Sequence, residues 1–487
     1  MNCGVDVVRR VRTHRITPAL AAITAMVVLY ACALGPNYKR PQVAAPQGFR
    51  GQEGAAEQAS IADLPWWEVF NDPALASLIK DALANNYDLL LAVQRIEQAR
   101  AVAVQVRSEL FPQVGYEGDT GRGKNAVNGR VASTAGLTVN AFAGLLNASW
   151  EIDLWGRIRR ADEAARAQIL VNEEARRGVM LSLVSDVAQA YFELLELDLQ
   201  REIALRTTES FRDSLDIFRR RLEGGVASRL ETARASASLA QTAAEVPNLE
   251  RLIVLKENQI NLLIGRPPAP VTRGAALTAQ RLPPEVPAGI PSDLLERRPD
   301  IRQAEQQIVS ANARIGVAIA DFFPRLDLTG LFGFASPQLS AITSGKNRVW
   351  SAAASLAGPL FQGGRLVGQY QQFKSEWEES RIRYEQTALN AFHEVSNALV
   401  SRQKLTEVRA QQARAVADLQ ESVSVSTQRY IAGLSSYFEV LEAQQQLFPA
   451  ENALAQTQLQ QLVVIVQLYR ALGGGWKLAD AEWATAQ

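Results

Sequence analysis

The longest hydrophobic pattern in the chain is a helical seam that no residue interrupts. Between residues 157 and 223 apolar side chains recur in alternating steps of four and three, which is the spacing of a helix that packs lengthwise against partners. The clearest members of this seam are Met180, Val184, Val187, Tyr191 and Leu194. The stretch lacks proline, so the sequence predicts one helix of about 67 residues, roughly 100 Å long at 1.5 Å per residue. Such a helix cannot be folded into a compact core and needs partners of similar length.

A second proline-free run of nearly the same length, 365–431, belongs to a repeat of half the chain. Asp88 and Asp300 begin similar segments, and each segment ends in Phe-Pro at the same spacing. Further matches are Gly156-Arg157 with Gly364-Arg365, Gly225 with Gly433, and Gly265 with Gly473. Similar helical composition alone would not keep glycines and prolines in register. The sequence therefore predicts an internal duplication.

Between the helical runs the period of the pattern changes to two. In the second half Leu326 and Leu328 alternate with Asp327 and Thr329, as in a half-exposed strand. Each half is thus expected to form a hairpin of two strands of about ten residues, long enough to cross an outer membrane when tilted. Four strands cannot close a barrel, and open edges cannot face lipid, so strands from several copies must join. Three copies give twelve strands and two give eight. A hairpin that caps a soluble helical bundle is the alternative.

Prolines and glycines set the remaining boundaries. We expect a signal peptide at 1–31, a lipid-anchored tether at 32–72, a first repeat at 73–265, an equatorial linker at 266–291, a second repeat at 292–473 and a C-terminal tail at 474–487. The first repeat is expected to contain a helix at 73–110, a hairpin at 111–154, a long helix at 157–223 and a return helix at 226–265. The second is expected to contain a helix at 292–322, a hairpin at 323–362, a long helix at 365–431 and a return helix at 434–473. A return helix is too short to cover its long partner, so we expect it to stack end to end on the helix that enters the hairpin.

The N-terminus has the pattern of an exported lipoprotein. Four arginines precede an apolar stretch at 19–31 that is too short to span a bilayer. This stretch ends with Leu29 and Ala31 before Cys32, the lipobox arrangement in which the cysteine is acylated after cleavage. Tyr30 is unusual at its position, and the alternative interpretation is an uncleaved anchor with an incidental cysteine. Cleavage would leave Cys32 as the only cysteine, so no disulfide could form within one chain.

Composition and motifs argue against other functional classes. Lys+Arg and Asp+Glu are balanced at 51 each, which is not the charge of a nucleic-acid-binding protein. The only histidines are His14, within the signal, and His393, so neither a zinc site nor a Ser-His-Asp triad is expected. We therefore expect no enzymatic activity, no metal site and no cofactor apart from the lipid on Cys32.

Several ordered motifs resemble the outer-membrane factor family, the TolC-like channels, and within it the OprM-like, NodT-type lipoproteins. These motifs are Gly35-Pro36-Asn37-Tyr38-Lys39-Arg40-Pro41, Trp150-Glu-Ile-Asp-Leu-Trp-Gly-Arg157, Pro359-Leu-Phe-Gln-Gly-Gly-Arg365 and Tyr469-Arg-Ala-Leu-Gly-Gly-Gly-Trp476. The resemblance implies a mixed α/β membrane protein: a homotrimer with a twelve-stranded outer-membrane β-barrel, four strands per chain, continued by a periplasmic α-helical barrel. It also implies a Gram-negative outer membrane, a periplasmic adaptor, an inner-membrane transporter of RND type and export of drugs or other small molecules, as in multidrug resistance.

The resemblance also implies two functional regions near the ends of the long helices. The periplasmic gate would contain Tyr430, Phe438, Glu439 and Glu442, with the glutamates attracting cations near a three-fold axis. The adaptor would dock on the turns at Gly224, Gly225, Ser228, Gly433 and Ser436. Their small residues would allow close approach of another helical hairpin. Ordinary tight turns and solvated glutamates are the alternatives at these positions. Gln445 occupies a place that can carry arginine in the family, so we expect fewer ionic ties at the gate.

Two other functions remain open from the sequence. A periplasmic coiled-coil scaffold or adaptor without a barrel would use the same long helices. A type I secretion exit duct would use the same channel for protein cargo. Because the inner-membrane pump selects the cargo, the sequence of the channel does not separate multidrug, heavy-metal and protein export, although the low methionine content disfavours a copper or silver relay.

Overall fold

The computed structural model describes residues 33–52, 60–70, 72–124, 138–282 and 288–475. These residues form two compact units, each made of three separate stretches of the chain. The first contains the described parts of Met1–Lys39, Ala99–Ile169 and Gln307–Ser380, and the second contains those of Arg40–Gln98, Leu170–Gln306 and Arg381–Gln487. The predicted signal peptide, the predicted acylation site Cys32 and most of the predicted C-terminal tail lie outside the described residues.

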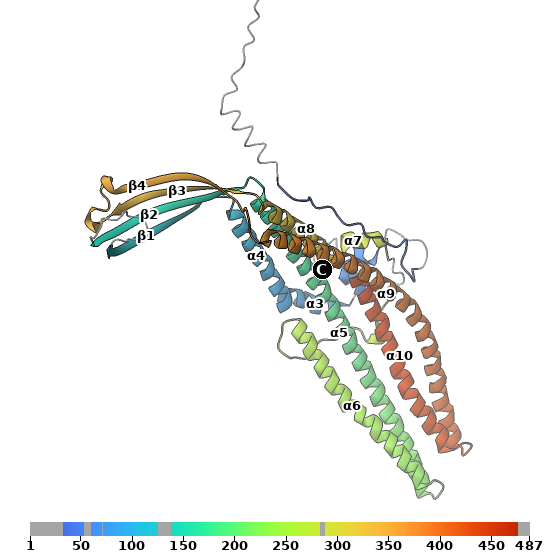
Figure 1. Cartoon of the computed structure of the whole chain (residues 1–487). Coiled ribbons are helices and arrows are strands. Elements are labelled where there is room, and N and C mark those ends of the chain that lie inside the picture. Colours follow the sequence, from blue (N-terminus) through green and yellow to red (C-terminus); the bar gives the residue numbers. More distant parts are fainter. Residues whose placement is uncertain (1–32, 53–59, 71, 125–137, 283–287, 476–487) are drawn as a thin grey trace, which may run out of the picture. The chain divides into compact units, whose positions relative to one another are not determined.

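The first unit contains one antiparallel four-stranded sheet with the strand order β1-β2-β3-β4 (Figure 1). The strands are β1 (Gln113–Lys124), β2 (Thr138–Ile152), β3 (Arg325–Ser336) and β4 (Arg348–Ala357). The first hairpin pairs Gln113 with Ser149, and the second pairs Arg325 with Ala357. The hairpins join through β2 and β3, which leaves β1 and β4 as the two edges of the sheet.

The two faces of this sheet differ in polarity. Because all the registers pair even with even numbers, every even-numbered strand residue lies on one face. Large apolar side chains that are exposed on the even face include Val114, Tyr116, Leu146, Trp150, Phe332, Trp350 and Leu356. The odd face carries Glu117, Asp119, Asn147, Ser149, Glu151, Asp327, Thr329 and Ser355. A sheet with one apolar and one polar face is the pattern of a barrel wall between lipid and water.

Two helices of 67 residues run through both units. They are α5 (Arg157–Glu223) and α9 (Arg365–Ile431), and their bounds are those that the sequence predicted. Each is followed by a turn and by a return helix of 35 residues, α6 (Arg229–Leu263) or α10 (Tyr437–Ala471). The chain reverses at Gly225 and Gly433, where φ is +76° and +75°, a backbone conformation that glycine adopts without strain.

The helix expected at 73–110 is divided into two helices. These are α3 (Pro73–Asn85), capped by Asp72, and α4 (Tyr87–Ser108). The single-helix prediction was wrong because Asn86 is extended (φ −65°, ψ 128°) and its side-chain oxygen accepts a hydrogen bond from the backbone of Leu89 at 3.1 Å. The corresponding segment of the second half is also divided, into a 3-10 turn (Pro291–Asp293), α7 (Leu294–Arg297) and α8 (Pro299–Ala320).

The predicted end-to-end stacking of the short helices is confirmed. The Asn86 side chain, before α4, donates a hydrogen bond to the carbonyl of Leu263 at the end of α6 (2.9 Å). In the second half Arg298, before α8, donates to the carbonyl of Ala471 at the end of α10 (2.8 Å). Side chains at equivalent positions therefore satisfy the last carbonyls of both return helices, which helix ends otherwise leave unpaired.

A polar joint holds the linker and the N-terminal segment against the helices of the second unit. Tyr191 on α5 donates to Asp72 (3.1 Å) and accepts from the backbone of Gly274 (2.8 Å). The same Asp72 accepts from Gln280 of the linker at 2.8 Å. Near the end of α10, Tyr469 donates to the carbonyl of Leu64 at 3.1 Å. The linker and the N-terminal segment are thus both bonded to the helices of this unit.

Candidate functional site

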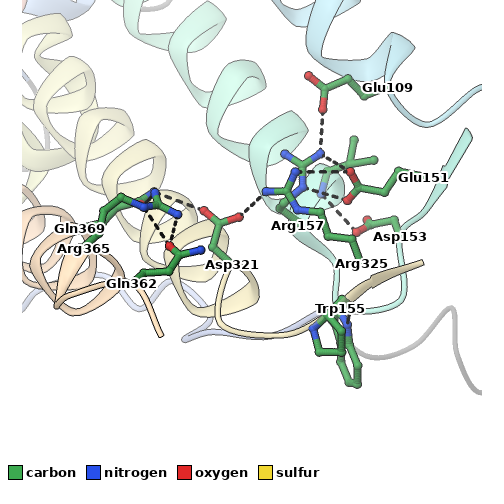
Figure 2. A network of polar contacts seen from close by, with 12 residues as sticks. Glu109, Glu151, Asp153, Trp155, Arg157, Asp321, Arg325, Gln362, Arg365 and Gln369 are labelled. Atoms are coloured by element: carbon green, nitrogen blue, oxygen red, sulfur yellow. Dashed lines mark hydrogen bonds and ion pairs between the residues drawn. The ribbon is translucent and has the colours of Figure 1, made fainter. Parts of the chain in front are cut away.

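An ion-pair network closes the base of the first hairpin. Arg157, the first residue of α5, donates through Nη2 to Glu109 at 3.0 Å and to Glu151 at 2.9 Å, and through Nε to Glu151 at 2.9 Å (Figure 2). Asp153 caps the same helix by accepting from the backbone of Ile158 and Arg159 at 3.2 and 3.0 Å. The carboxylates offset the positive end of the helix dipole and fix the angle at which β2 enters α5.

The base of the second hairpin has different chemistry. Arg365, which is the equivalent of Arg157, donates to two amide side chains, Gln362 at 2.9 Å and Gln369 at 3.5 Å (Figure 2). The nearby carboxylate of Asp321 accepts from Arg325 at 2.9 Å and from Gln369 at 3.2 Å. Arg365 is therefore held by neutral amides where Arg157 is held by carboxylates, and the ion pair of the second base joins Asp321 to Arg325.

A buried arginine holds the N-terminal segment of the first unit. Arg160 is 5% exposed, and it donates to the carbonyl of Leu34 (3.1 Å) and to the side chain of Asn37 (2.8 Å). Gly35 fits against Gly316 so closely that a Cβ on Gly35 would lie 2.5 Å from the Cα of Gly316. The glycine and asparagine of the Gly-Pro-Asn motif thus have a physical role, because they seat this segment on α5 and α8.

Both turns between long and return helices are open to solvent. The residues at Gly224, Gly225, Ser228, Gly433 and Ser436 are all exposed. A Cβ built on Gly225 or on Gly433 meets nothing within 4 Å. The turns therefore leave their backbone accessible, as the docking hypothesis requires.

Tyr430 lies in a cluster that joins the two pairs of long and return helices. Its ring packs edge-on against Phe218 with centroids 5.1 Å apart, and the guanidinium carbon of Arg221 lies 4.4 Å from its centroid. Arg221 also donates to the carbonyl of Tyr430 at 2.7 Å, and the Tyr430 hydroxyl donates to Glu231 on α6 at 3.2 Å. Burial, followed by the charge of Glu231, raises the pKa of Tyr430 above its ordinary value of 10. The tyrosine therefore ties α9 to α5 and α6 as a neutral hydroxyl donor.

The other predicted gate residues lie outside this cluster. Phe438 is 50% exposed, and Glu439 and Glu442 are exposed on α10. Gln445 donates to the hydroxyl of Ser238 on α6 at 3.0 Å, which is a neutral tie between α10 and α6. One chain thus brings Tyr430 to a helix junction and leaves the acidic residues facing solvent.

Sequence reasoning missed the partners of Tyr430. Arg221 and Glu231 are 209 and 199 residues away from it along the chain, so no local pattern connects them. Glu231 had one available signal, because Ser228 and Glu231 form a capping box at the start of α6. Within the described ranges no group of three His, Cys, Asp or Glu side chains could hold a metal ion.

The chain matches known proteins over most of its length. The sequence model of the family described as "Outer membrane efflux protein" matches residues 78–266 and 290–474. A relative named "Toluene efflux pump outer membrane protein TtgC" from Pseudomonas putida is 35% identical over 460 residues, 93% of this chain and 95% of the relative. "Cation efflux system protein CusC" from Escherichia coli K12 is 33% identical over 455 residues, 92% and 97% of the two chains.

Solved structures show the same fold. The outer-membrane channel OprN has a TM-score of 0.84 and 31% identity, covering 91% of this chain and all of that one. The open state of the Neisseria gonorrhoeae MtrE outer membrane channel has a TM-score of 0.82 and 30% identity, covering 92% and 99%. These similarities, together with the sheet that has one apolar face and the paired long helices, show that the chain belongs to the outer membrane efflux protein family.

Proposed function

We propose that this protein is the outer-membrane channel of a tripartite efflux system and works as a homotrimer. The observation that carries the proposal is the four-stranded sheet with one apolar face and two unpaired edges, β1 and β4. Unpaired edges cannot stand in lipid because their backbone groups would lack hydrogen-bond partners. Three copies would close a twelve-stranded barrel wide enough for a channel, whereas eight strands from two copies would leave an interior that side chains fill.

The long helices would continue the channel into the periplasm. Each chain would contribute α5 and α9 together with the stacked pairs α6–α4 and α10–α8, so that three chains surround a common axis. An internal duplication accounts for this pattern, and it is supported by the equal lengths of the two long and the two return helices and by the two separate matches to the family sequence model.

The helix tips would carry both docking and gating. The exposed turns at Gly224–Gly225 and Gly433 would receive a periplasmic adaptor, which connects the channel to an inner-membrane transporter of RND type. Phe438, Glu439 and Glu442 would converge from three copies at the entrance, with Tyr430 holding the helices that carry them. The exposure of the turns and of the three α10 side chains supports this assignment.

A covalent lipid would anchor the N-terminus to the outer membrane. The lipobox-like motif predicts that Cys32 would carry the acyl group, and the contacts of Leu34 and Asn37 with Arg160 support an anchor in the unit that contains the sheet. Palmitate labelling of the wild type and of Cys32→Ser tests this assignment. Label in the wild type alone supports it, and an unlabelled wild type contradicts it.

Organic compounds are the expected cargo. The relatives include pump components named for toluene, for antibiotics and for cations. Only three methionines occur in this chain, so thioether sites for copper or silver ions are scarce. The channel would supply the conduit, and the inner-membrane transporter would select the compound.

Reconstitution of the purified protein in planar lipid bilayers tests the conduit. We expect discrete conductance steps with cation preference, because acidic residues line the proposed entrance. A variant with Trp350→Asp and Leu356→Asp on the apolar face should be unable to insert, since charges on the lipid face are costly. Soluble protein that needs no detergent and gives no conductance would contradict the proposal and favour a periplasmic scaffold.

A further inference from the structure

Charged residues of the sheet are divided between its two faces by sign. The carboxylates of the strands all lie at odd positions, on the polar face: Glu117, Asp119, Glu151 and Asp327. Arg122 on β1 and Arg348 on β4 lie at even positions, on the apolar face, and both are exposed. The apolar face thus carries exposed arginines and, within the described strands, no acidic residue that would neutralise them.

Both arginines lie toward the end of the sheet at which the chain turns within each hairpin. The opposite ends of the strands, at Gln113, Ile152, Arg325 and Ala357, adjoin the helical part of the unit (Figure 1). In the proposed channel the helices lie in the periplasm, so the turn end of the apolar face lies at the outer leaflet. A charge on the lipid face is costly at the bilayer midplane and costs little near the interface. This position therefore suits guanidinium groups at the level of the lipid head groups.

We propose that Arg122 and Arg348 bind the phosphate groups of a phosphorylated outer-leaflet lipid of the lipid A class. This inference rests on the proposed function, because it needs the apolar face in the membrane and the hairpin turns outside. A guanidinium presents a planar fork of N–H donors that matches two phosphate oxygens in parallel hydrogen bonds. Since the strands supply no carboxylate on this face, the counter-charge would come from the membrane.

The apolar face also has a place for an acyl chain next to Arg348. A shallow groove crosses the strands, and its floor is Ala148 and Gly330, which pair directly across β2 and β3. Large apolar side chains form its walls: Val114, Leu146, Phe332 and Trp350. Trp350 is two residues from Arg348 on the same face of β4, about 7 Å along the strand. One amphiphilic lipid can therefore place a phosphate at Arg348 and an acyl chain in the groove.

The neighbourhood of Arg348 matches the chemistry of a membrane interface. Trp350 is 73% exposed in one chain, and tryptophan is enriched where its ring lies at the level of the head groups. Basic side chains at this level bind phosphorylated head groups. The ring of Trp350 would cover the first carbons of the acyl chain while Arg348 holds the phosphate.

Lipid titrations followed by native mass spectrometry test the proposal on the full-length protein in mild detergent. The probes are bisphosphorylated lipid A, the same lipid A without its phosphates, and inorganic phosphate. We expect the wild-type trimer to retain bisphosphorylated lipid A at concentrations about tenfold lower than the dephosphorylated lipid, since loss of charge-assisted hydrogen bonds weakens binding by this order. Inorganic phosphate at the same concentration should not displace the lipid, because it lacks acyl chains.

Substitution of the arginines separates the charge from the geometry of the fork. Arg122→Gln and Arg348→Gln should each weaken binding of bisphosphorylated lipid A about tenfold and leave binding of the dephosphorylated lipid unchanged. Arg348→Lys keeps the charge without the fork and should give an intermediate affinity. Arg314→Gln is the matched control, because Arg314 is an exposed arginine on α8, outside the sheet, and this variant should bind like the wild type.

Filling the groove tests the acyl-chain part of the site independently. A Cβ built on Gly330 lies 3.9 Å from the Cβ of Ala148, which is ordinary van der Waals contact, so Gly330→Leu is compatible with the sheet and fills the floor. We expect this variant to weaken binding of both forms of lipid A by a similar factor. Ala354→Leu is the matched control at an exposed position of the same face outside the groove, and it should leave binding unchanged.

The same spectra report assembly, and bilayer recordings report conduction. Conducting trimers that bind both forms of lipid A equally, or that bind bisphosphorylated lipid A equally well without Arg122 and Arg348, would overturn the lipid site and leave the channel intact. Displacement by inorganic phosphate would reveal an anion site without lipid specificity and would also overturn the proposal. Wild-type protein that is a single chain and gives no conductance would overturn the proposed function itself.

Discussion

The two hairpins have equivalent strand pairing and differ in the residues at their bases. In the first half Arg157 meets the carboxylates of Glu109 and Glu151, whereas in the second half Arg365 meets amides. The positions of Glu151 and Asp153 are occupied in the second half by Pro359 and Phe361. The second half thus lacks the two carboxylates that hold Arg157 and cap α5 in the first half, and it keeps an ion pair between Asp321 and Arg325.

This difference matches the origin of the strand that pairs with each hairpin. The second strand of the first hairpin, β2, pairs with β3 of the same chain, so ion pairs at its base can form as the chain folds. The second hairpin ends in the open strand β4, which in our account pairs with another copy. Apolar residues at that base can be buried only on assembly, and they stabilise the ring because exposed apolar area is removed from water.

Large side chains introduced at the two turns between long and return helices should give the largest loss of function. We expect Gly225→Trp and Gly433→Trp each to abolish drug export, because the side chain would hold an adaptor hairpin away from the backbone. Gly225→Ala and Gly433→Ala are the matched controls, since they introduce the same positive-φ strain without the bulk. Drug accumulation in cells is the measurement. Normal export by both tryptophan variants would rule out docking at these turns.

Substitutions at the two hairpin bases should give the next largest effect, and the loss of stability should differ between the two bases. Arg157→Ala removes the ion pairs with Glu109 and Glu151 and should cost about 2 kcal/mol. Arg365→Ala removes only bonds to amides at an exposed site and should cost less than about 0.5 kcal/mol. The temperature at which the assembled protein dissociates on a gel reports both. An equal loss in the two variants would mean that the bases are energetically alike.

Substitutions at the proposed gate should separate the role of a hydrogen bond between helices from the role of an acidic charge. Tyr430→Phe removes the hydrogen bond to Glu231 and keeps the ring against Phe218 and Arg221, so we expect higher single-channel conductance with unchanged cation preference. Glu442→Ala removes an acidic residue and should mainly weaken cation preference. The double variant should show both changes. Conductance and selectivity that match the wild type in assembled protein would refute the gate.

A buried carboxyl on α5 should make the stability depend on pH. Burial, followed by the charge of Glu193, raises the pKa of Glu196 from 4.5 to about 7. Between these values the folded state keeps a proton that the unfolded state releases, so stability falls as the pH rises from 4.5 to 7. Its equivalent, Lys404, is exposed and pairs with Glu407 at 2.8 Å.

Glu196→Gln should therefore raise the stability by about 1 kcal/mol at pH 8 and have little effect at pH 4.5. Lys404→Gln is the matched control, and it should show no such dependence because its side chain is solvated. Thermal unfolding of the helices, followed by circular dichroism at both pH values, is the measurement. A gain that is the same at both values would exclude Glu196 as the titrating group.

Local signals explain what the sequence could predict. The bounds of α5 and α9 follow from glycines on either side of runs without proline, and the faces of the hairpins follow from a period of two. The break at Asn86 was missed because an asparagine flanked by helix formers gives no clear stop signal. The Tyr430 cluster was missed because its partners come from the other half of the chain, and only packing of the four helices brings them together.

In the proposed channel three copies close one barrel through β1 and β4. Native mass spectrometry of wild-type protein extracted from the outer membrane measures the number of chains directly. We predict one species with the mass of three mature chains, each with its covalent lipid. A species with the mass of one chain or of two chains would contradict the account.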